Sequence, residues 1–538
     1  MALPLWALLV VPLSAALALL YVHSWRRPEH GLAVLVAGIA FHNTGVLALL
    51  YVDTPEPIIR VLQLWKEALI VLLLLKVGEA LVVEARAGTV RSRFHDWRGT
   101  NLGVRIIDVT IVGFSLLLMV YAVLPPGVVA VESISITQRL LGFRMLAIIP
   151  ALYVIGRWLA TRSPGGLSAV ARLAVLTAVA VALGGLVELW FIPTSQWVAL
   201  GVPHFIGMQG FADGGPGGLP SNFFQSTTAG LALRRMVSTY LSPLGIAYTG
   251  LLVVPMISAG LLSDGPRRRT MLWIALTLAV ASIALSVTRL ALLCLVGESV
   301  LLAVMFRRRA AVAAAGVAVA GMFVALTIYP LIGPLVTYAL EDVRPPAGQV
   351  ALQVVLGAQA SPLPSPTSTP GPTTTVPGPD ADILNRLVTG DDASIQGHIE
   401  WIRIGLEFAT KHPLGVGLGA STYRFGTGIG PGESAFLGIA GELGWAGLLL
   451  NLLAYCGVIV VSLLAALRTK EWPDLAFHLA CGIGGIGLLP IAATSAVWGD
   501  FSVTYLFWAA AGISMTLAAR RVTARTGHLP RQLANSVG

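Results

Sequence analysis

The chain has 538 residues, of which 56% are hydrophobic and only 11% are charged, and its mean hydropathy is +0.81. Soluble domains carry about 25% charged residues, so a soluble globule of this composition would lack the polar side chains needed to cover its surface. The apolar residues occur in blocks of about twenty, the length that crosses a hydrocarbon core as a helix. Composition therefore excludes an ordinary soluble enzyme and predicts an all-α polytopic membrane protein.

The charged residues also argue against nucleic-acid binding. Thirty-five Lys and Arg oppose 26 Asp and Glu, which gives a net charge of +9, but the basic residues do not form one stripe. They lie in short clusters between apolar blocks, the pattern that sets membrane topology. The three cysteines, Cys294, Cys456 and Cys481, lie inside apolar blocks and are expected to be small buried hydrophobes, without a disulfide framework or metal-ligand spacing.

Apolar segments predict about 12–13 transmembrane helices. The N-terminal segment has no basic residue before its apolar run, so we expect a retained first helix and not a cleaved signal peptide. The predicted spans, in chain order, are 4–22, 31–52, 58–83, 104–125, 141–159, 168–190, 241–262, 271–288, 290–306, 310–330, 435–466, 475–496 and 500–519.

One orientation places every basic cluster on the same side of the membrane. Positive residues favour the cytoplasmic side, so we predict cytoplasmic clusters and an external N-terminus. The external side then receives 53–57, 126–140, 191–240, the turn at 288–290, 331–434 and 497–499. The cytoplasmic clusters are Arg26/Arg27, Arg86 to Arg105, Arg157/Arg162/Arg172, Arg267–Arg269, Arg307–Arg309, Arg468/Lys470 and Arg520/Arg521/Arg525.

This pattern divides the chain into five regions. Residues 1–140 and 141–330 hold the N-terminal and central helices, 331–434 form a large extracytoplasmic loop, 435–519 hold the C-terminal helices, and 520–538 form a cytoplasmic tail. Within the loop, the Pro/Thr/Ser-rich tract 359–380 has almost nothing to bury and reads as a linker. Residues 395–411 carry Ile399, Ile402 and Leu406 at helical spacing, which predicts an interfacial helix.

Placing one ionisable side chain at the centre of the bilayer costs about 2.5–3.5 kcal/mol, so each such group is expected either to pair with another group or to have a function. Lys76 and Glu79 lie three residues apart and are expected to neutralise each other. Lys66 and Glu67, nearer the outer leaflet, are either paired or functional. Glu298 is solitary in sequence, so we expect a partner elsewhere in the bundle.

Arginines at the external ends of the predicted spans depart from the cytoplasmic bias. They are Arg144, Arg234, Arg235 and Arg289. Each is either an interfacial anchor that extends toward the headgroups or part of a cationic pocket. Guanidinium groups bind phosphate oxygens in bidentate fashion, so several on one face favour a pocket for a phosphorylated lipid headgroup.

Several dispersed segments over about 140–465 resemble the bacterial O-antigen ligase and O-antigen polymerase superfamily of membrane glycosyltransferases. The resemblance rests on their order, spacing and common external side. The segments are RLLGFRMLAIIPALYVIGRWLA, RMVSTYLSPLGIAYTGLLVVPMI, SVTRLALLCL, HIEWIRIGLEFATKHPLGVGLGASTYRFG and GESAFLGIAGELGWAGLLL.

The resemblance implies a C-type glycosyltransferase-like helical fold in the cell inner (cytoplasmic) membrane, with the active site on the extracytoplasmic face. It implies a metal-independent reaction without a cofactor, in which a lipid or glycan acceptor hydroxyl attacks an undecaprenyl-pyrophosphate-linked glycan. By motif, Arg235 and Arg289 would hold the pyrophosphate, with Arg144 and the adjacent Arg234 as further candidates. Fixed cations there would stabilise the departing negative charge.

One position departs from the family pattern. Ligases of this family carry a His–Asn pair at the start of the closing segment, where this chain has Glu433–Ser434. Glu433 is the candidate substitute base, and a Glu–Ser start is more similar to the polymerase-like members. His398 is an alternative catalytic candidate, as is His412, and each is otherwise an exposed loop histidine. Gly415, Gly417 and Gly419 predict a tight turn near the headgroup.

Three interpretations stay open from sequence. The first is the glycosyltransferase. The second is a transporter or flippase for lipid-linked glycans or polar solutes, which would have internal repeats and midplane charges. The third is a family member that binds the lipid donor without catalysis.

Overall fold

The computed structural model describes residues 5–89, 97–125, 128, 134–209, 214–227, 231–263, 269–344, 393–420 and 433–525. Within these residues, eleven helices are long and apolar enough to cross a membrane, which confirms a polytopic, predominantly helical membrane protein. They correspond to eleven of the thirteen predicted spans. The other two spans are also helical: α13 (Arg269–Leu285) is shorter, and α5 (Trp65–Arg86) carries six ionisable side chains.

The remaining elements follow the predicted order along the chain. The first half contains α1 (Leu5–Arg26), α2 (Pro28–Gly38), α3 (His42–Tyr51), α4 (Glu56–Gln63), α7 (Leu102–Val123), α8 (Ile136–Arg162), α9 (Leu167–Phe191), α10 (Thr194–Ala199), α11 (Val202–Met208) and α12 (Pro243–Leu262). The second half contains α14 (Arg289–Phe306), α15 (Arg309–Phe323), α16 (Tyr329–Ile332), α19 (Ala393–Lys411), α20 (Ala435–Ala466), α21 (Asp474–Thr494) and α22 (Phe501–Arg525).

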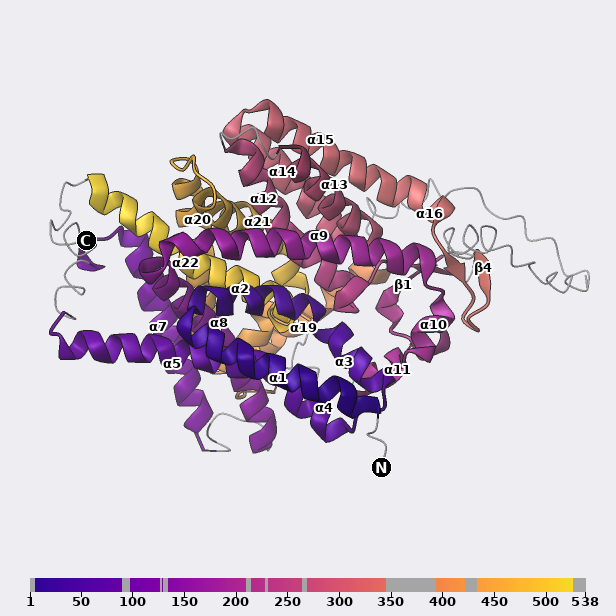
Figure 1. Cartoon of the computed structure of the whole chain (residues 1–538), viewed down its shortest axis with the longest axis horizontal. Coiled ribbons are helices and arrows are strands. Elements are labelled where there is room, and N and C mark those ends of the chain that lie inside the picture. The colour runs from indigo at the N-terminus through magenta and orange to yellow at the C-terminus, as the bar shows by residue number, and fades with distance from the viewer. Residues whose placement is uncertain are drawn as a thin grey trace, which may run out of the picture.

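Helices α12 and α22 form the centre of the bundle (Figure 1). Of the most apolar stretch in each helix, 94% of the residues are buried in α22 and 89% in α12, against 6% in α1. Glycines allow α8 and α22 to cross closely, since a Cβ on Gly512 would lie 2.1 Å from the Tyr153 carbonyl oxygen. The peripheral α1 instead leaves its apolar side chains exposed, as a helix facing lipid would.

A small antiparallel sheet, which the sequence did not predict, joins the two long loops assigned to the external side. Its order is β1 (Phe224–Ser226), β2 (Ala232–Arg234), β3 (Leu335–Val336) and β4 (Asp342–Arg344), and Leu233 of the first loop pairs with Leu335 of the second. Figure 1 places the sheet beside α10 and α16, at the end of the molecule away from the C-terminus. The two loops therefore share one side, as the arginine pattern requires.

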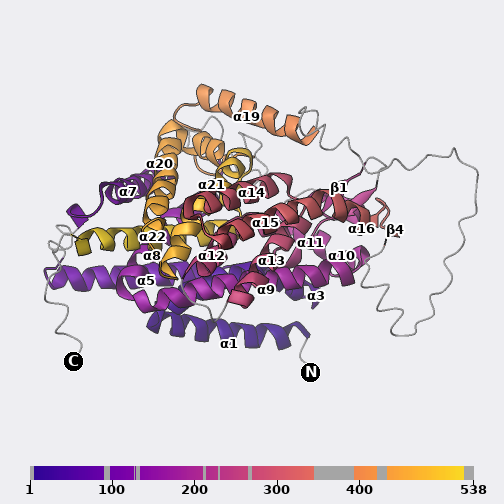
Figure 2. The same cartoon turned by 90° about the horizontal axis from the view of Figure 1, so that it is seen from above.

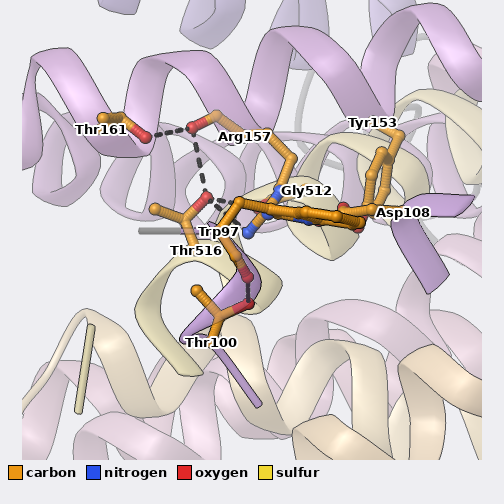
Figure 3. A network of polar contacts seen from close by, with 8 residues as sticks. All are labelled: Trp97, Thr100, Asp108, Tyr153, Arg157, Thr161, Gly512 and Thr516. Atoms are coloured by element: carbon orange, nitrogen blue, oxygen red, sulfur yellow. Dashed lines mark hydrogen bonds and ion pairs between the residues drawn. The ribbon is translucent and has the colours of Figure 1, made fainter. Parts of the chain in front are cut away.

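At the opposite end, a polar network ties α7, α8 and α22 together (Figure 3). Asp108 accepts hydrogen bonds from Arg157 at 2.6 Å, from the Tyr153 hydroxyl at 2.6 Å and from the Trp97 indole at 3.0 Å. Arg157 also contacts Thr516 of α22 at 3.4 Å. The carboxylate is satisfied by three donors, so the network stabilises the bundle at the end predicted to be cytoplasmic.

Among the predictions for charged residues and cysteines, some are confirmed and others are wrong. Lys76 and Glu79 form the expected ion pair at 2.6 Å. The expectation that Glu298 finds a partner is wrong: it is 2% exposed, and no described residue hydrogen-bonds either of its carboxylate oxygens. Cys481 is buried, but Cys456 is exposed, because its side of α20 does not face the bundle.

Helix α19 matches the helix predicted over 395–411, and it lies along one edge of the bundle beside α20 (Figure 2). It packs through Gly405 and Ala409, whereas Ile399 and Leu406 remain exposed. The apolar stripe expected from sequence is therefore not the face that contacts the protein. The predicted linker 359–380 lies outside the described residues.

Candidate functional site

A cavity of about 760 Å³ lies at the end of the bundle assigned to the external side. Its walls come from the start of α3, the α4–α5 junction, the first halves of α8, α12 and α20, the end of α11, residues 220–223 and the turn over 495–502. Helix ends distant in sequence thus meet around one space of the size that small-molecule sites have. Its acidic and basic lining residues are His42, Arg60, Lys66, Arg144, Glu442 and Asp500.

Arg144, one of the predicted pyrophosphate ligands, lines this cavity. It lies in the third turn of α8, on the side that faces α5 and α22. Its Nε is 3.6 Å from Glu67 Oε1, and its guanidinium is 5.7 Å from the centre of the Phe501 ring. The Nε is buried without a hydrogen bond to any described residue. Arg144 therefore pairs loosely with Glu67 and presents a cation to the cavity.

Arg235 and Arg289 come together beside the cavity but do not line it. Arg235 Nη1 donates to the carbonyl of Asn222, a lining residue, at 3.0 Å, and its Nη2 donates to Thr288 Oγ1 at 2.8 Å. Burial lowers the pKa of Arg235 to about 10, and the neighbouring charge of Arg289 acts in the same direction. Arg235 therefore connects the cavity wall, through Asn222, with Thr288, the residue that precedes Arg289.

Arg234 is placed differently from the other candidate arginines. Its side chain is 3% exposed and forms an ion pair with Glu188 of α9, while a second nitrogen donates to the Ile192 carbonyl. Glu188 also accepts from Trp197 and from the backbone of Val237. This pair anchors strand β2 to α9, and the arginine does not line the cavity.

The two candidate bases, Glu433 and His398, contact each other. His398 Nδ1 lies 3.4 Å from Glu433 Oε2, which joins α19 to the segment that precedes α20. Their hydrogen bond raises the pKa of His398. Neither residue lines the cavity, but Ser434, the next residue, does so and caps α20 by accepting from the Leu437 amide.

Two carboxylates that the sequence analysis did not select line the cavity. Asp500 caps the start of α22, because its Oδ1 accepts from the Ser502 amide at 3.0 Å. Glu442 lies two residues before Gly444, where α20 kinks with a φ of +68°. Glu442 could have been selected from the sequence, because it begins a Glu–x–Gly–x–x–Gly pattern with Gly444 and Gly447. For Asp500 the only signal in the sequence was its place directly after the predicted external turn 497–499.

The predicted glycine turn forms and packs against this kink. Gly415, Gly417 and Gly419 have φ values of +74°, +101° and +82°. A Cβ on Gly415 would lie 2.6 Å from the Gly444 amide nitrogen, so the turn and the kink approach too closely for side chains. This contact fixes the start of α20, and with it Ser434 and Glu442, against the cavity.

In comparisons with known proteins, the sequence matches no protein-family model and no curated protein. The chemistry of the site therefore rests on its own residues. The arginines in its lining, Arg60 of α4 and Arg144 of α8, favour an anionic ligand, and the carboxylates Asp500 and Glu442 near the starts of α22 and α20 are possible proton acceptors. No cluster of three metal-ligating side chains occurs among the described residues.

Proposed function

We propose that this protein is a membrane glycosyltransferase of the O-antigen ligase or polymerase type, working in surface polysaccharide assembly in the inner membrane. It would move a glycan from undecaprenyl pyrophosphate to an acceptor hydroxyl on the extracytoplasmic face. The observation that carries this proposal is the cavity at that end of the bundle, which Arg144 and Arg60 line and which Arg235 and Arg289 adjoin.

The charge distribution suits such a transfer. When the bond from the anomeric carbon to the pyrophosphate oxygen breaks, negative charge builds on the leaving group, and fixed guanidinium groups stabilise it. The side chain of Arg144 lines the cavity and is 36% exposed, so its guanidinium can donate to a phosphate oxygen. Arg234, committed to Glu188, is left with a structural role in this proposal.

The test compares Arg144→Ala with Arg403→Ala in proteoliposomes that contain an undecaprenyl-pyrophosphate-linked glycan and an acceptor. Arg403 is an exposed arginine of α19 paired with Glu400, so it controls for the loss of one positive charge. We expect Arg144→Ala to lower release of undecaprenyl pyrophosphate at least 100-fold, about the effect of removing one charge-stabilising donor, and Arg403→Ala to leave it unchanged. Equal rates in the two variants would refute the proposal.

The buried carboxyl of Glu298, to which no described residue hydrogen-bonds, favours a second candidate function, a transporter or flippase for lipid-linked glycans. Such a protein moves labelled lipid-linked glycan across a vesicle membrane without an acceptor, and Glu298→Gln should slow that movement. Movement without transfer would favour the transporter, whereas donor binding with neither activity would identify a non-catalytic donor-binding protein.

A further inference from the structure

Three Lys and Arg side chains line the cavity, and their hydrogen bonds distinguish them. Arg60 of α4 donates from Nε and from Nη2 to the carboxylate of Glu56, at 3.0 and 2.5 Å. The side chain of Lys66 is 4% exposed, and its Nζ donates to the Gln63 carbonyl at 2.8 Å and lies 3.1 Å from His42 Nε2. Both residues therefore use their nitrogens on neighbouring groups of the protein.

Arg144 differs from the other two. Its side chain is 36% exposed, and no described residue accepts a hydrogen bond from its terminal nitrogens, Nη1 and Nη2. Its buried Nε faces Glu67 of α5 at 3.6 Å, which is too long for a hydrogen bond. Arg144 therefore presents its terminal N–H groups to the cavity, where they can bind two oxygens of one phosphate group together.

A long side chain without hydrogen bonds needs another contact to hold it in one orientation, because a ligand that must immobilise it loses affinity. The ion pair with Glu67 attracts Arg144 but, without a hydrogen bond, gives it little direction. The directional contact comes from Phe501. The guanidinium carbon of Arg144 lies 5.7 Å from the centre of the Phe501 ring, within the range of about 6 Å in which the face of an aromatic ring attracts a cation.

The start of α22 fixes Phe501 in place. The preceding residue, Asp500, caps the helix, because its Oδ1 accepts from the Ser502 amide and its carbonyl accepts from the Thr504 amide, both at 3.0 Å. The ring also packs against Tyr505, one turn further along, with 5.7 Å between the ring centres. Because α22 is buried at the centre of the bundle, the ring is a rigid surface for the arginine.

We infer that Phe501 is a positioning residue for the lipid pyrophosphate. Its ring holds the guanidinium of Arg144 at the corner of the cavity between α5, α8 and α22, with the terminal nitrogens toward the cavity, and the pyrophosphate binds at this corner. The identity of the ligand rests on the proposed function, whereas the contact between ring and arginine rests on the structure alone. Phe501 acts through Arg144 and takes no part in bond making.

Two neighbours make an ordinary substitution hard to interpret. Glu67 attracts Arg144, but its negative charge also repels a phosphate, so a change of Glu67 would alter the affinity in two opposite directions. Lys66 Nζ lies 5.3 Å from the centre of the same Phe501 ring, so an effect of the ring could pass through Lys66 instead. A decisive test changes the ring without changing charge or shape, and does so both with and without Arg144.

Fluorination of the Phe501 ring meets these conditions. Fluorine atoms withdraw electron density from the ring face and weaken its attraction for a cation, while the shape of the ring changes little. Mono-, di- and trifluorophenylalanine are incorporated at position 501, and binding of undecaprenyl pyrophosphate to the full-length protein in detergent is measured by native mass spectrometry. We expect the affinity to fall with each fluorine, by about 2- to 12-fold for three, the cost of immobilising one long side chain.

Two controls separate this contact from a general effect of fluorination. The same substitutions at Phe323, which is 59% exposed at the end of α15 and does not line the cavity, should leave the affinity unchanged. In the Arg144→Ala variant, fluorination of Phe501 should have no further effect, because the two residues act as one unit. A decline that persists in Arg144→Ala would assign the effect to Lys66 and overturn the inference.

Binding requires no acceptor, so the inference and the proposed function can fail separately. Equal affinities across the fluorinated series, in a protein that transfers glycan, would overturn the role of Phe501 and leave the glycosyltransferase unaffected. A graded loss of affinity in a protein that transfers no glycan would support the role of Phe501 and overturn the transfer reaction. A wild-type protein that does not bind undecaprenyl pyrophosphate would overturn both.

Discussion

Replacing Glu188 by Gln should destabilise the protein strongly, because it leaves the guanidinium of Arg234 buried without a counter-charge. The two side chains are 5% and 3% exposed, and Glu188 also accepts hydrogen bonds from Trp197 Nε1 at 3.2 Å and from the Val237 amide at 3.2 Å. Breaking a buried ion pair by removing one partner costs about 3–5 kcal/mol. We expect a loss in this range in the free energy of unfolding.

The assay is reversible unfolding in detergent, followed by tryptophan fluorescence. Glu400→Gln is the control, since it removes a carboxylate from the exposed Glu400–Arg403 pair and should have no measurable effect. The double variant Glu188→Leu/Arg234→Met should recover most of the stability, because apolar residues replace the buried pair. A stability loss in Glu188→Gln no larger than that in Glu400→Gln would refute the reasoning.

The same double variant separates two roles for Arg234. The structure uses this arginine to hold β2 against α9, whereas the sequence analysis offered it as a pyrophosphate ligand. If its role is structural, the double variant binds the lipid-linked donor as tightly as wild type. A loss of donor affinity in a stable double variant would instead show that Arg234 contributes to binding the donor.

Two further outcomes follow from particular contacts. Gly512→Ala should destabilise the bundle by about 1–3 kcal/mol in the same unfolding assay, because the added methyl would lie 2.1 Å from the Tyr153 carbonyl, and Gly297→Ala, with open space around its Cα, is the control that should not. Contact with Glu433 raises the pKa of His398 above its ordinary value of 6.5, so its stabilisation is fully present below pH 6.5 and is lost as the pH rises through the raised value. Both side chains are more than 40% exposed, so the effect should stay below about 1 kcal/mol. Thermal unfolding of wild type and His398→Gln should therefore differ at pH 6 and converge above the raised pKa, and a difference independent of pH would contradict this explanation.

The sequence by itself determined the membrane class, the positions of the spans and the shared side of the two long loops. Hydropathy and the distribution of arginines are local properties, and a helix in lipid satisfies its own backbone hydrogen bonds, so neighbours change its bounds little. The same local logic predicted the turn at Gly415, Gly417 and Gly419 and the Lys76–Glu79 pair, whose partners are close in the chain.

Tertiary structure alone decided the contacts of the ionisable groups in and around the cavity. Arg234 and Arg235 are adjacent in sequence, yet β2 turns the first toward Glu188 and the second toward Asn222 beside the cavity. Lys66 pairs with its sequence neighbour Glu67 at 3.6 Å, yet α3 also brings His42 Nε2, 24 residues away in the chain, to within 3.1 Å of its amine. Charge and hydrogen-bond energies depend on groups a few ångströms away in space, and folding supplies those neighbours from distant parts of the chain.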